Sequence, residues 1–221
     1  MTMHKVNDLL QNVEYDDEVR VGIFPNGQCY NSTTKKEKHY WDPNAWDFVN
    51  ISPFRINTEK NKFTVTGCNT LAYLTLEDHP FNYSVGCLSS CNSLDTVIKH
   101  GSCSGIGCCQ TDIPKGASTF KFSFDERFNN AEVYNFSRCS YAMVVEEAQL
   151  KFNTTYITDE DWIDDTELAA VLDWAIGNTT CEEAQTNKPS YACISSNSIC
   201  STTYFDVFSR FRQDSTKSSW K

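Results

Sequence analysis

The chain has 221 residues, 40% of them hydrophobic, and a formal net charge of −10 at pH 7. This length suits one large domain or about one and a half smaller ones. No apolar run approaches the roughly eighteen residues that a membrane-spanning helix needs. The negative charge argues against broad electrostatic attraction to nucleic acid or to an anionic membrane.

Short strands dominate the predicted elements. They are rich in β-branched and aromatic residues, and several alternate apolar with polar residues, as half-buried strands do. In chain order, strands are predicted at 18–24, 62–67, 70–76, 120–124, 131–136 and 141–152. Asn26-Gly27 and Lys115-Gly116 are predicted turns, and the Ser-, Gly- and Asn-rich stretch 87–109 is predicted to be a loop held by bridges.

The segment 158–178 fits two interpretations. Thr158 and the acids after it resemble a helix N-terminus, and apolar residues follow at helical spacing. The sequence AVLDWAIG could equally be a strand that ends at Gly177. We expect a short helix at 164–170 followed by a strand, with a domain boundary near 177–181 where the cysteine spacing changes.

Cysteine content and glycosylation motifs together indicate the secretory pathway. The chain has 11 cysteines, and disulfides persist in oxidising compartments. The motif Asn-x-Ser/Thr occurs six times, where about two or three occurrences are expected by chance. The candidate N-glycosylation sites are Asn31, Asn50, Asn82, Asn135, Asn153 and Asn178. The alternative is a cytosolic chain merely rich in Asn, Ser and Thr, and the first residues show no signal-peptide pattern.

Three cysteines lie within seven positions, at Cys103, Cys108 and Cys109, which a metal, a catalytic thiol or a set of disulfides could explain. Zinc sites use paired short spacings, and neither these cysteines nor the four histidines provide them. A thiol enzyme needs an oriented base, and His100 is close only in sequence. Side chains of adjacent residues diverge along an extended strand, so disulfides are favoured, each stabilising by about 2–4 kcal/mol.

No catalytic constellation is found, and an enzyme is not predicted. The sequence lacks the G-x-S-x-G motif of serine hydrolases. Carboxylate pairs carry no weight as glycosidase evidence in a chain this acidic. The patterns as a whole predict a mainly β, disulfide-rich, sandwich-like fold with long bridged loops and at most short helices.

Six segments, in the same order along the chain, resemble the extracellular part of plant wall-associated receptor kinases. The string at 101–116 is the most specific of them. The segments are GCNTLAYL (67–74), GCLSSC (86–91), GSCSGIGCCQTDIPKG (101–116), FSRCSYAMVVEEAQLKF (136–152), VLDWAIGNTTCEEA (171–184) and YACISSNSIC (191–200).

This resemblance implies a domain organisation. Residues 1–66 are similar to the C-terminal part of a galacturonan-binding domain, and residues 67–177 to the cysteine-rich wall-associated-kinase domain. Residues 178–200 resemble the start of an EGF-like module, and 201–221 are a diverged tail. The resemblance implies truncation at both ends, and kinase activity is not carried over because the glycine-rich loop, H-R-D and D-F-G are missing.

The resemblance to an EGF-like module also implies disulfide pairings. In that module the first cysteine pairs with the third and the second with the fourth, so Cys181 would bond to Cys200 and leave Cys193 free. The other eight cysteines would form four bridges whose connectivity the sequence does not determine. They are Cys29, Cys68, Cys87, Cys91, Cys103, Cys108, Cys109 and Cys139.

The resemblance implies an extracellular or cell-wall fragment that binds pectin, oligogalacturonides or another wall polysaccharide. Galacturonan is a polyanion, so an acidic chain would need a local basic patch or bridging Ca²⁺ to bind it. The acidic run 146–173 lacks the EF-hand spacing and is expected to be a solvated face. The candidate carbohydrate-binding residues come from one basic, aromatic-containing stretch: Lys35, Lys36, Lys38, His39, Trp41, Trp46, Arg55, Lys60 and Lys62.

Two other functions remain open on the sequence. The chain could be a structural or protein-interaction module, or a truncated relic without binding activity. Apart from Ca²⁺ bridging of pectin, no cofactor is predicted, and no protein metal site, nucleic-acid partner or membrane span is expected.

Overall fold

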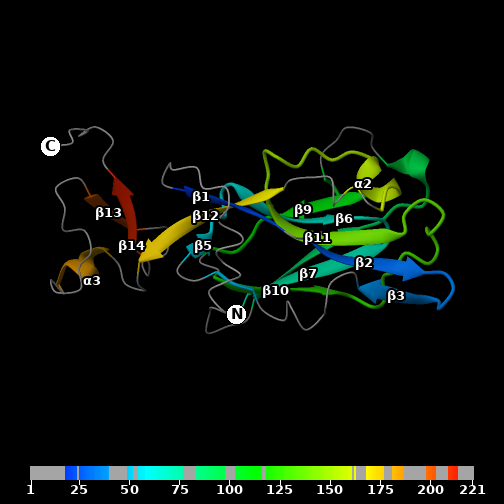
Figure 1. Ribbon diagram of the computed structural model, residues 1–221, viewed down its shortest axis with the longest axis horizontal. Helices are drawn as coiled ribbons and strands as arrows, with labels where there is room; N and C mark the ends of the chain where they lie inside the picture. The colour runs from blue at the N-terminus through cyan, green and yellow to red at the C-terminus, as the bar shows by residue number, and fades with distance from the viewer. Residues whose placement is uncertain are drawn as a thin grey trace.

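The computed structural model describes residues 18–23, 25–39, 49–51, 54–76, 83–97, 103–115, 118–160, 162, 168–176, 181–186, 198–202 and 209–213. Within these ranges the chain forms antiparallel strands in three sheets, with only short helical segments between them (Figure 1). None of the described helices has the length and apolar character needed to cross a membrane. The predicted mainly β fold with bridged loops is confirmed.

The first sheet is built around a strand that is covered on both faces. Its order is β3-β2-β11-β6-β9, with β2 (Asn26–Asn31), β3 (Lys36–His39), β6 (Asn61–Thr66), β9 (Cys108–Thr111) and β11 (Cys139–Glu146). All eight residues of β11 are buried. Successive side chains of a strand point to opposite faces, so Ala142 and Val144 belong to one core, and Tyr141, Met143 and Val145 to another.

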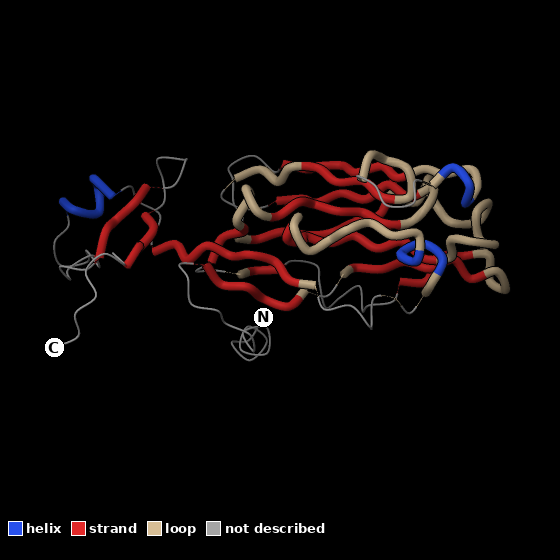
Figure 2. The backbone as a smooth tube through the Cα atoms, turned by 90° about the horizontal axis from the view of Figure 1, so that it is seen from above, coloured by secondary structure: helices blue, strands red, loops and turns tan. Residues whose placement is uncertain are grey.

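The second sheet packs against the first to form the sandwich (Figure 2). Its order is β4-β10-β7-β8, with β4 (Val49–Asn50), β7 (Thr70–Leu76), β8 (Tyr83–Ser89) and β10 (Thr119–Phe124). Every second residue of β7 is buried, as the alternating sequence predicts. Ala72, Leu74 and Leu76 share a core with Phe63 and Val65 of the first sheet.

The third sheet joins the sandwich to a separate C-terminal hairpin. It contains β1 (Glu18–Gly22), β5 (Phe54–Ile56), β12 (Ala169–Ile176), β13 (Ser198–Thr202) and β14 (Ser209–Gln213). The strand β12 pairs with β1 and β5 at the sandwich and with β14 near its far end. In Figure 1 the hairpin and helix α3 (Cys181–Thr186) lie apart from the sandwich, with β12 between them.

Two polar contacts fasten this third sheet to the first. Asn61 is fully buried, and its side-chain amide donates to the carbonyl of Val171 (2.7 Å) and accepts from the N–H of Val171 (2.9 Å). The Asn61 side chain thus makes with the backbone of Val171, in β12, the two hydrogen bonds that a neighbouring strand would otherwise make. Arg20 of β1 donates through Nε and Nη2 to the two carboxylate oxygens of Glu146 on β11, both at 3.1 Å, a bidentate geometry that fixes orientation.

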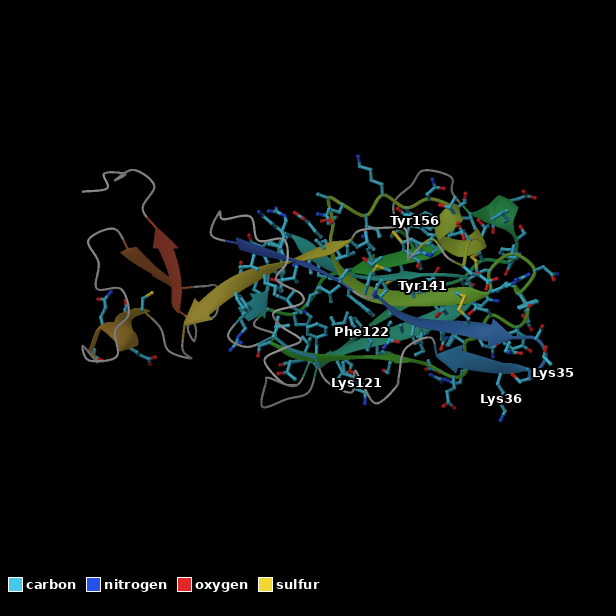
Figure 3. All side chains as sticks on the ribbon, in the orientation of Figure 1. Lys35, Lys36, Lys121, Phe122, Tyr141 and Tyr156 are labelled. Carbon is cyan, nitrogen blue, oxygen red and sulfur yellow. A yellow bond between two sulfur atoms is a disulfide. The ribbon has the colours of Figure 1, made fainter. Side chains whose placement is uncertain are left out.

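A second core lies on the face of the first sheet that points away from the sandwich. The chain after β11 folds back over this face through helix α2 (Thr155–Thr158). Trp162 meets the ring of Tyr141 edge-on at 5.5 Å and stacks on Tyr156 at 4.2 Å, and Tyr141 Oη donates to the carbonyl of Glu160 (2.8 Å). Figure 3 shows Tyr141 and Tyr156 in these positions. This cover explains why the first sheet is buried on both faces.

The eight cysteines grouped in the sequence analysis form four disulfides. Cys29–Cys139 joins residues directly opposite each other on β2 and β11, and Cys68–Cys91 anchors the loop after β8. The adjacent cysteines diverge: Cys109 crosses the sandwich to Cys87 on β8, while Cys108 bonds to Cys103 within the same turn. The described parts of the stretch 90–107, residues 90–97 and 103–107, therefore form loop held by bridges, with a short 3₁₀ turn, η1 (Leu94–Thr96).

Cys181 is also in a disulfide, and its partner lies outside the described side chains. Helix α3, which begins at Cys181, lies beside β13, which contains Cys200. The pairing of Cys181 with Cys200 therefore stays a prediction that this placement supports. Cys193 lies outside the described residues.

A fully buried polar network holds the turn between β6 and β7. Asn130 donates through Nδ2 to the carbonyl of Cys68 (3.1 Å) and accepts from Ser140 Oγ (3.1 Å). Ser137 Oγ accepts from the N–H of Cys68 (3.1 Å). Gly67 has φ +126°, a conformation that favours glycine, and a Cβ there would lie 2.4 Å from Ser140 Oγ. The network satisfies the backbone N–H and carbonyl of Cys68, and the Gly67 N–H donates to the Gly107 carbonyl (3.0 Å), so the turn is fixed without strand pairing.

Several local predictions are corrected by the structure. The strand predicted at 141–152 ends at Glu146, and the loop predicted at 87–109 has strand residues at both ends, in β8 and β9. Asn26-Gly27 is the start of β2 rather than a turn. Glycine suits this strand position because a Cβ at residue 27 would lie only 2.9 Å from Cε1 of the Tyr141 ring. Residues 131–136 form consecutive turns rather than a strand. The helix expected at 164–170 does not include its last two residues, which begin β12, and 163–167 lie outside the described residues.

The division after residue 66 does not separate two structural units. Strand β6 ends at Thr66 and pairs with β11, and β2 pairs with the same strand on its other side. Strands from 1–66 and from 67–177 therefore share one sheet and one core. The family-based naming of these ranges, and of 178–200 and 201–221, stays an expectation.

Candidate functional site

The β2–β3 hairpin carries two of the candidate carbohydrate-binding residues on its tip. Asn31 Oδ1 accepts hydrogen bonds from the N–H groups of Thr33 (2.9 Å) and Thr34 (3.0 Å), and the N–H of Lys35 donates to the Asn31 carbonyl (2.8 Å). Lys35 has a positive φ of 54°. This turn places the exposed side chains of Lys35 and Lys36 at the end of the sandwich (Figure 3).

Aromatic rings and a guanidinium lie beside this tip. Tyr30 meets Tyr134 edge-on at 5.8 Å between ring centroids, and the guanidinium of Arg138 lies 4.9 Å from the centroid of Tyr134. Ser32 Oγ donates to Tyr134 Oη (3.3 Å), which joins the tip of the hairpin to the ring pair. We refer to Tyr30, Ser32, Lys35, Lys36, Tyr134 and Arg138 as the hairpin cluster.

Two of the three cationic side chains of the cluster make no ion pair with the described residues, and the third is paired through one nitrogen. Neither Lys35 nor Lys36 makes an ion pair there. Arg138 donates to Glu160 through Nη1 alone (2.6 Å), and its pKa is raised, first by this hydrogen bond. Its Nε and Nη2 have no partner within the described ranges, so they remain available to an incoming anion.

Lys60 and Lys62 do not join this cluster. The strand register places Cys29 opposite Cys139 at one end of β11 and Asn61 opposite Glu146 at the other end. The two ends of this eight-residue strand are about 24 Å apart. Lys60 and Lys62 lie at the second end. The described lysines of the stretch 35–62 therefore lie at two separate ends of the first sheet.

The residues at that second end are engaged by other groups. Lys62 pairs with Asp112 (2.5 Å) and lies 3.8 Å from Glu147, and the hydrogen bond with Asp112 is the largest cause of its raised pKa. Arg55 on β5 donates to the carbonyl of Phe54 (3.0 Å). A ligand carboxylate would have to displace these contacts.

Several predicted site residues lie partly or wholly outside the described residues. The backbones of Lys38 and His39 lie in β3 and that of Asn50 in β4, without described side chains. Trp41, Trp46, Asn82 and Asn178 lie outside the described residues. Asn31, Asn135 and Asn153 are described, and the last two are exposed.

The acidic run does not form a metal site within the described ranges, where no group of three or more His, Cys, Asp or Glu side chains is arranged to hold an ion. Three of its carboxylates contact bases instead: Glu146 binds Arg20, Glu147 lies near Lys62, and Glu160 binds Arg138.

Sequence reasoning missed Tyr30, Tyr134 and Arg138. They meet because Cys29 and Cys139 are bonded directly opposite each other, which brings the residues beside them together, and the Tyr30 N–H donates to the Arg138 carbonyl (2.8 Å). Tyr30 and Arg138 are the sequence neighbours of Cys29 and Cys139. The sequence could have indicated that they meet only if the pairing of these two cysteines had been known.

The fold and its bridges define a disulfide-stapled β-sandwich of the secreted type. The chain is homologous to the wall-associated receptor kinases of Arabidopsis thaliana. It is 33% identical to wall-associated receptor kinase 2 over 175 residues, which is 79% of this chain and 22% of that protein. It is 33% identical to wall-associated receptor kinase 3 over 185 residues (78% and 24%) and 30% identical to wall-associated receptor kinase 1 over 186 residues (81% and 23%).

The chain thus spans about a quarter or less of the length of these relatives. The similarity supports a receptor ectodomain. No protein-family model and no solved structure gives a significant match.

Proposed function

We propose that the chain is an extracellular polysaccharide-binding fragment that binds de-esterified pectin or oligogalacturonides through the hairpin cluster, and that it binds without catalysing a reaction. The observation that carries the proposal is that one exposed end of the sandwich holds Lys35 and Lys36 on the β2–β3 turn, while Ser32 of the same turn bonds to Tyr134, whose ring lies against Arg138 and Tyr30. Homology to wall-associated receptors supports a ligand of the cell wall.

The chemistry of a uronate polymer matches this arrangement. Each sugar carries a carboxylate, which guanidinium and ammonium groups bind by charge-assisted hydrogen bonds. The C–H face of a pyranose ring is apolar and can lie against a tyrosine ring, while the tyrosine hydroxyl stays in water. The rest of the chain is acidic, so this local cluster must supply the attraction, with Ca²⁺ as a possible bridge between carboxylates.

The test is retention of the folded, disulfide-bonded protein on de-esterified polygalacturonate, across a salt series, with and without Ca²⁺. The double variant Lys35→Gln/Lys36→Gln is expected to reduce retention about tenfold, because each exposed ion pair contributes at most about 1 kcal/mol. The dependence on salt should also become shallower, since fewer counterions are released on binding.

Lys151→Gln is the matched control. Lys151 is exposed and, like the hairpin lysines, makes no ion pair with the described residues. Its neighbour Phe152 packs near Gly107, next to β9 at the opposite edge of the sheet from β3. Its replacement should leave retention unchanged. Because it removes one positive charge where the hairpin variant removes two, a loss half as large in binding free energy would show that net charge, rather than the hairpin cluster, controls retention.

A protein-interaction role is the second candidate, because one region exposes apolar side chains. Leu88, Leu94 and Ile106 are 44%, 37% and 38% exposed, and all lie in or beside the disulfide-bridged loop after β8. The N–H of Ser90 donates to the carbonyl of Gly105 (2.9 Å), so the two arms of this loop are adjacent. A folded protein without salt-sensitive retention on polygalacturonate would favour this role.

A further inference from the structure

Buried asparagines and asparagines that begin an Asn-x-Ser/Thr motif use their side-chain nitrogen differently. Three of the described asparagines are buried, and each donates through Nδ2: Asn57 to Asp173 (3.0 Å), Asn61 to Val171, and Asn130 to Cys68. None of the three begins an Asn-x-Ser/Thr motif. Their amides are structural, and any substituent on Nδ2 would break the contacts described above.

The asparagines that begin such a motif behave in the opposite way. Asn31 and Asn153 accept hydrogen bonds through Oδ1, from Thr33 and from Thr155 (3.2 Å) respectively. These contacts hold the carbonyl side of each amide against its own turn. Asn135 is exposed, and within the described ranges none of the three Nδ2 groups has a partner. Each Nδ2 can therefore carry a bulky substituent without loss of a contact.

We infer that Asn31, Asn135 and Asn153 carry N-linked oligosaccharides, and that Asn135 receives its oligosaccharide only before the chain around it folds. Asn31 lies opposite Lys36 on the hairpin, so its oligosaccharide would border the hairpin cluster, and the retention assay of the proposed function is carried out on unglycosylated protein. In this reaction Nδ2 forms a bond to C1 of the first sugar of a polyisoprenoid-diphosphate oligosaccharide. The sugar–phosphate bond breaks, the polyisoprenoid diphosphate leaves, and the amide proton passes to a base of the transferase.

The timing follows from the hydroxyl residue of each motif. The transferase recognises the hydroxyl two residues after the asparagine as part of the motif. Thr33 and Thr155 are exposed in the folded chain. Ser137, the hydroxyl residue for Asn135, is 0% exposed, and its Oγ accepts from the N–H of Cys68 (3.1 Å). Folding therefore hides the Asn135 motif and leaves the other two accessible.

The first measurement is site occupancy in protein secreted from a eukaryotic host behind a heterologous signal peptide. Peptide mapping after enzymatic deglycosylation in ¹⁸O-water should find label at Asn31, Asn135 and Asn153. Asn135→Gln, which keeps Ser137 and its contacts, should lose one oligosaccharide by intact mass. Secreted, disulfide-bonded protein without label at these three sites would overturn the inference.

The second measurement tests the timing. Unglycosylated chain, folded with its disulfides in a bacterial periplasm, is incubated with purified oligosaccharyltransferase and its lipid-linked donor. Asn31 and Asn153 should be modified, with occupancy at Asn135 at least about tenfold lower. After reduction and unfolding, Asn135 should reach the occupancy of the others. Equal modification of all three sites in the folded protein would contradict the role assigned to Ser137.

Discussion

Replacing Cys29 and Cys139 together with alanine is expected to lower the free energy of unfolding by about 4–5 kcal/mol. The two residues are separated by 110 positions in sequence, so their bridge removes more freedom from the unfolded chain than any other described disulfide. The loss should appear as a lower urea midpoint for the double variant, measured by tryptophan fluorescence with the other disulfides intact.

Cys103→Ala/Cys108→Ala is the matched control, because it also removes one bridge and two sulfur atoms. Its cysteines are only 5 positions apart, and the same argument predicts a loss of about 2 kcal/mol. The two variants should therefore differ clearly in midpoint. The reverse order would mean that contacts in the folded state, rather than restriction of the unfolded chain, determine what these bridges contribute.

Asn130→Ala is expected to destabilise the protein by about 3–5 kcal/mol, a large part of the 5–15 kcal/mol typical of a folded domain. The variant leaves the carbonyl of Cys68 and the hydroxyl of Ser140 without their partner in a fully buried region. It also leaves a cavity beneath the turn at Gly67. Urea unfolding again measures the loss, and a reduced yield of secreted protein should accompany it.

Asn129→Ala separates this network from a general effect of changing the loop. Asn129 is the neighbouring residue, is partly exposed, and uses Oδ1 only to accept from the N–H of Ala131 (3.0 Å). Losing that contact should cost about 1 kcal/mol. Similar losses in the two variants would show that the buried network is not what stabilises the turn.

The sequence predicted strands well where one local pattern dominated. Residues 70–76 alternate strictly between buried and partly buried positions and form β7 with the predicted bounds. Local patterns failed where a distant residue decided the outcome. Asn26-Gly27 is a strong turn signal, yet the ring of Tyr141 uses the space over Gly27 within a sheet. At 131–136, backbone groups bond within consecutive turns, as from the Val133 N–H to the Asn130 carbonyl and from the Phe136 N–H to the Val133 carbonyl, in place of a partner strand.

The candidate site could be predicted only in part for a related reason. Lys35 and Lys36 were accessible to sequence reasoning because a basic, turn-forming stretch is a local feature. Tyr30 and Arg138 are far apart in the chain and are joined by the pairing of Cys29 with Cys139, which composition and spacing do not determine. Lys62 was predicted to bind the ligand because its own charge is visible in the sequence. Its ion-pair partner, Asp112, is 50 residues away in the chain and could not be recognised from local sequence.

Strand β12 has a mechanical consequence for the molecule. It is hydrogen-bonded to β1 and β5 at the sandwich and to β14 in the C-terminal hairpin, and Asn61 grips its backbone at Val171. A pull on the hairpin directed along β12 would stress these hydrogen bonds in shear. Hydrogen bonds loaded in shear must break together rather than one after another. Strand β12 should therefore transmit force between the C-terminal hairpin and the sandwich until these hydrogen bonds break.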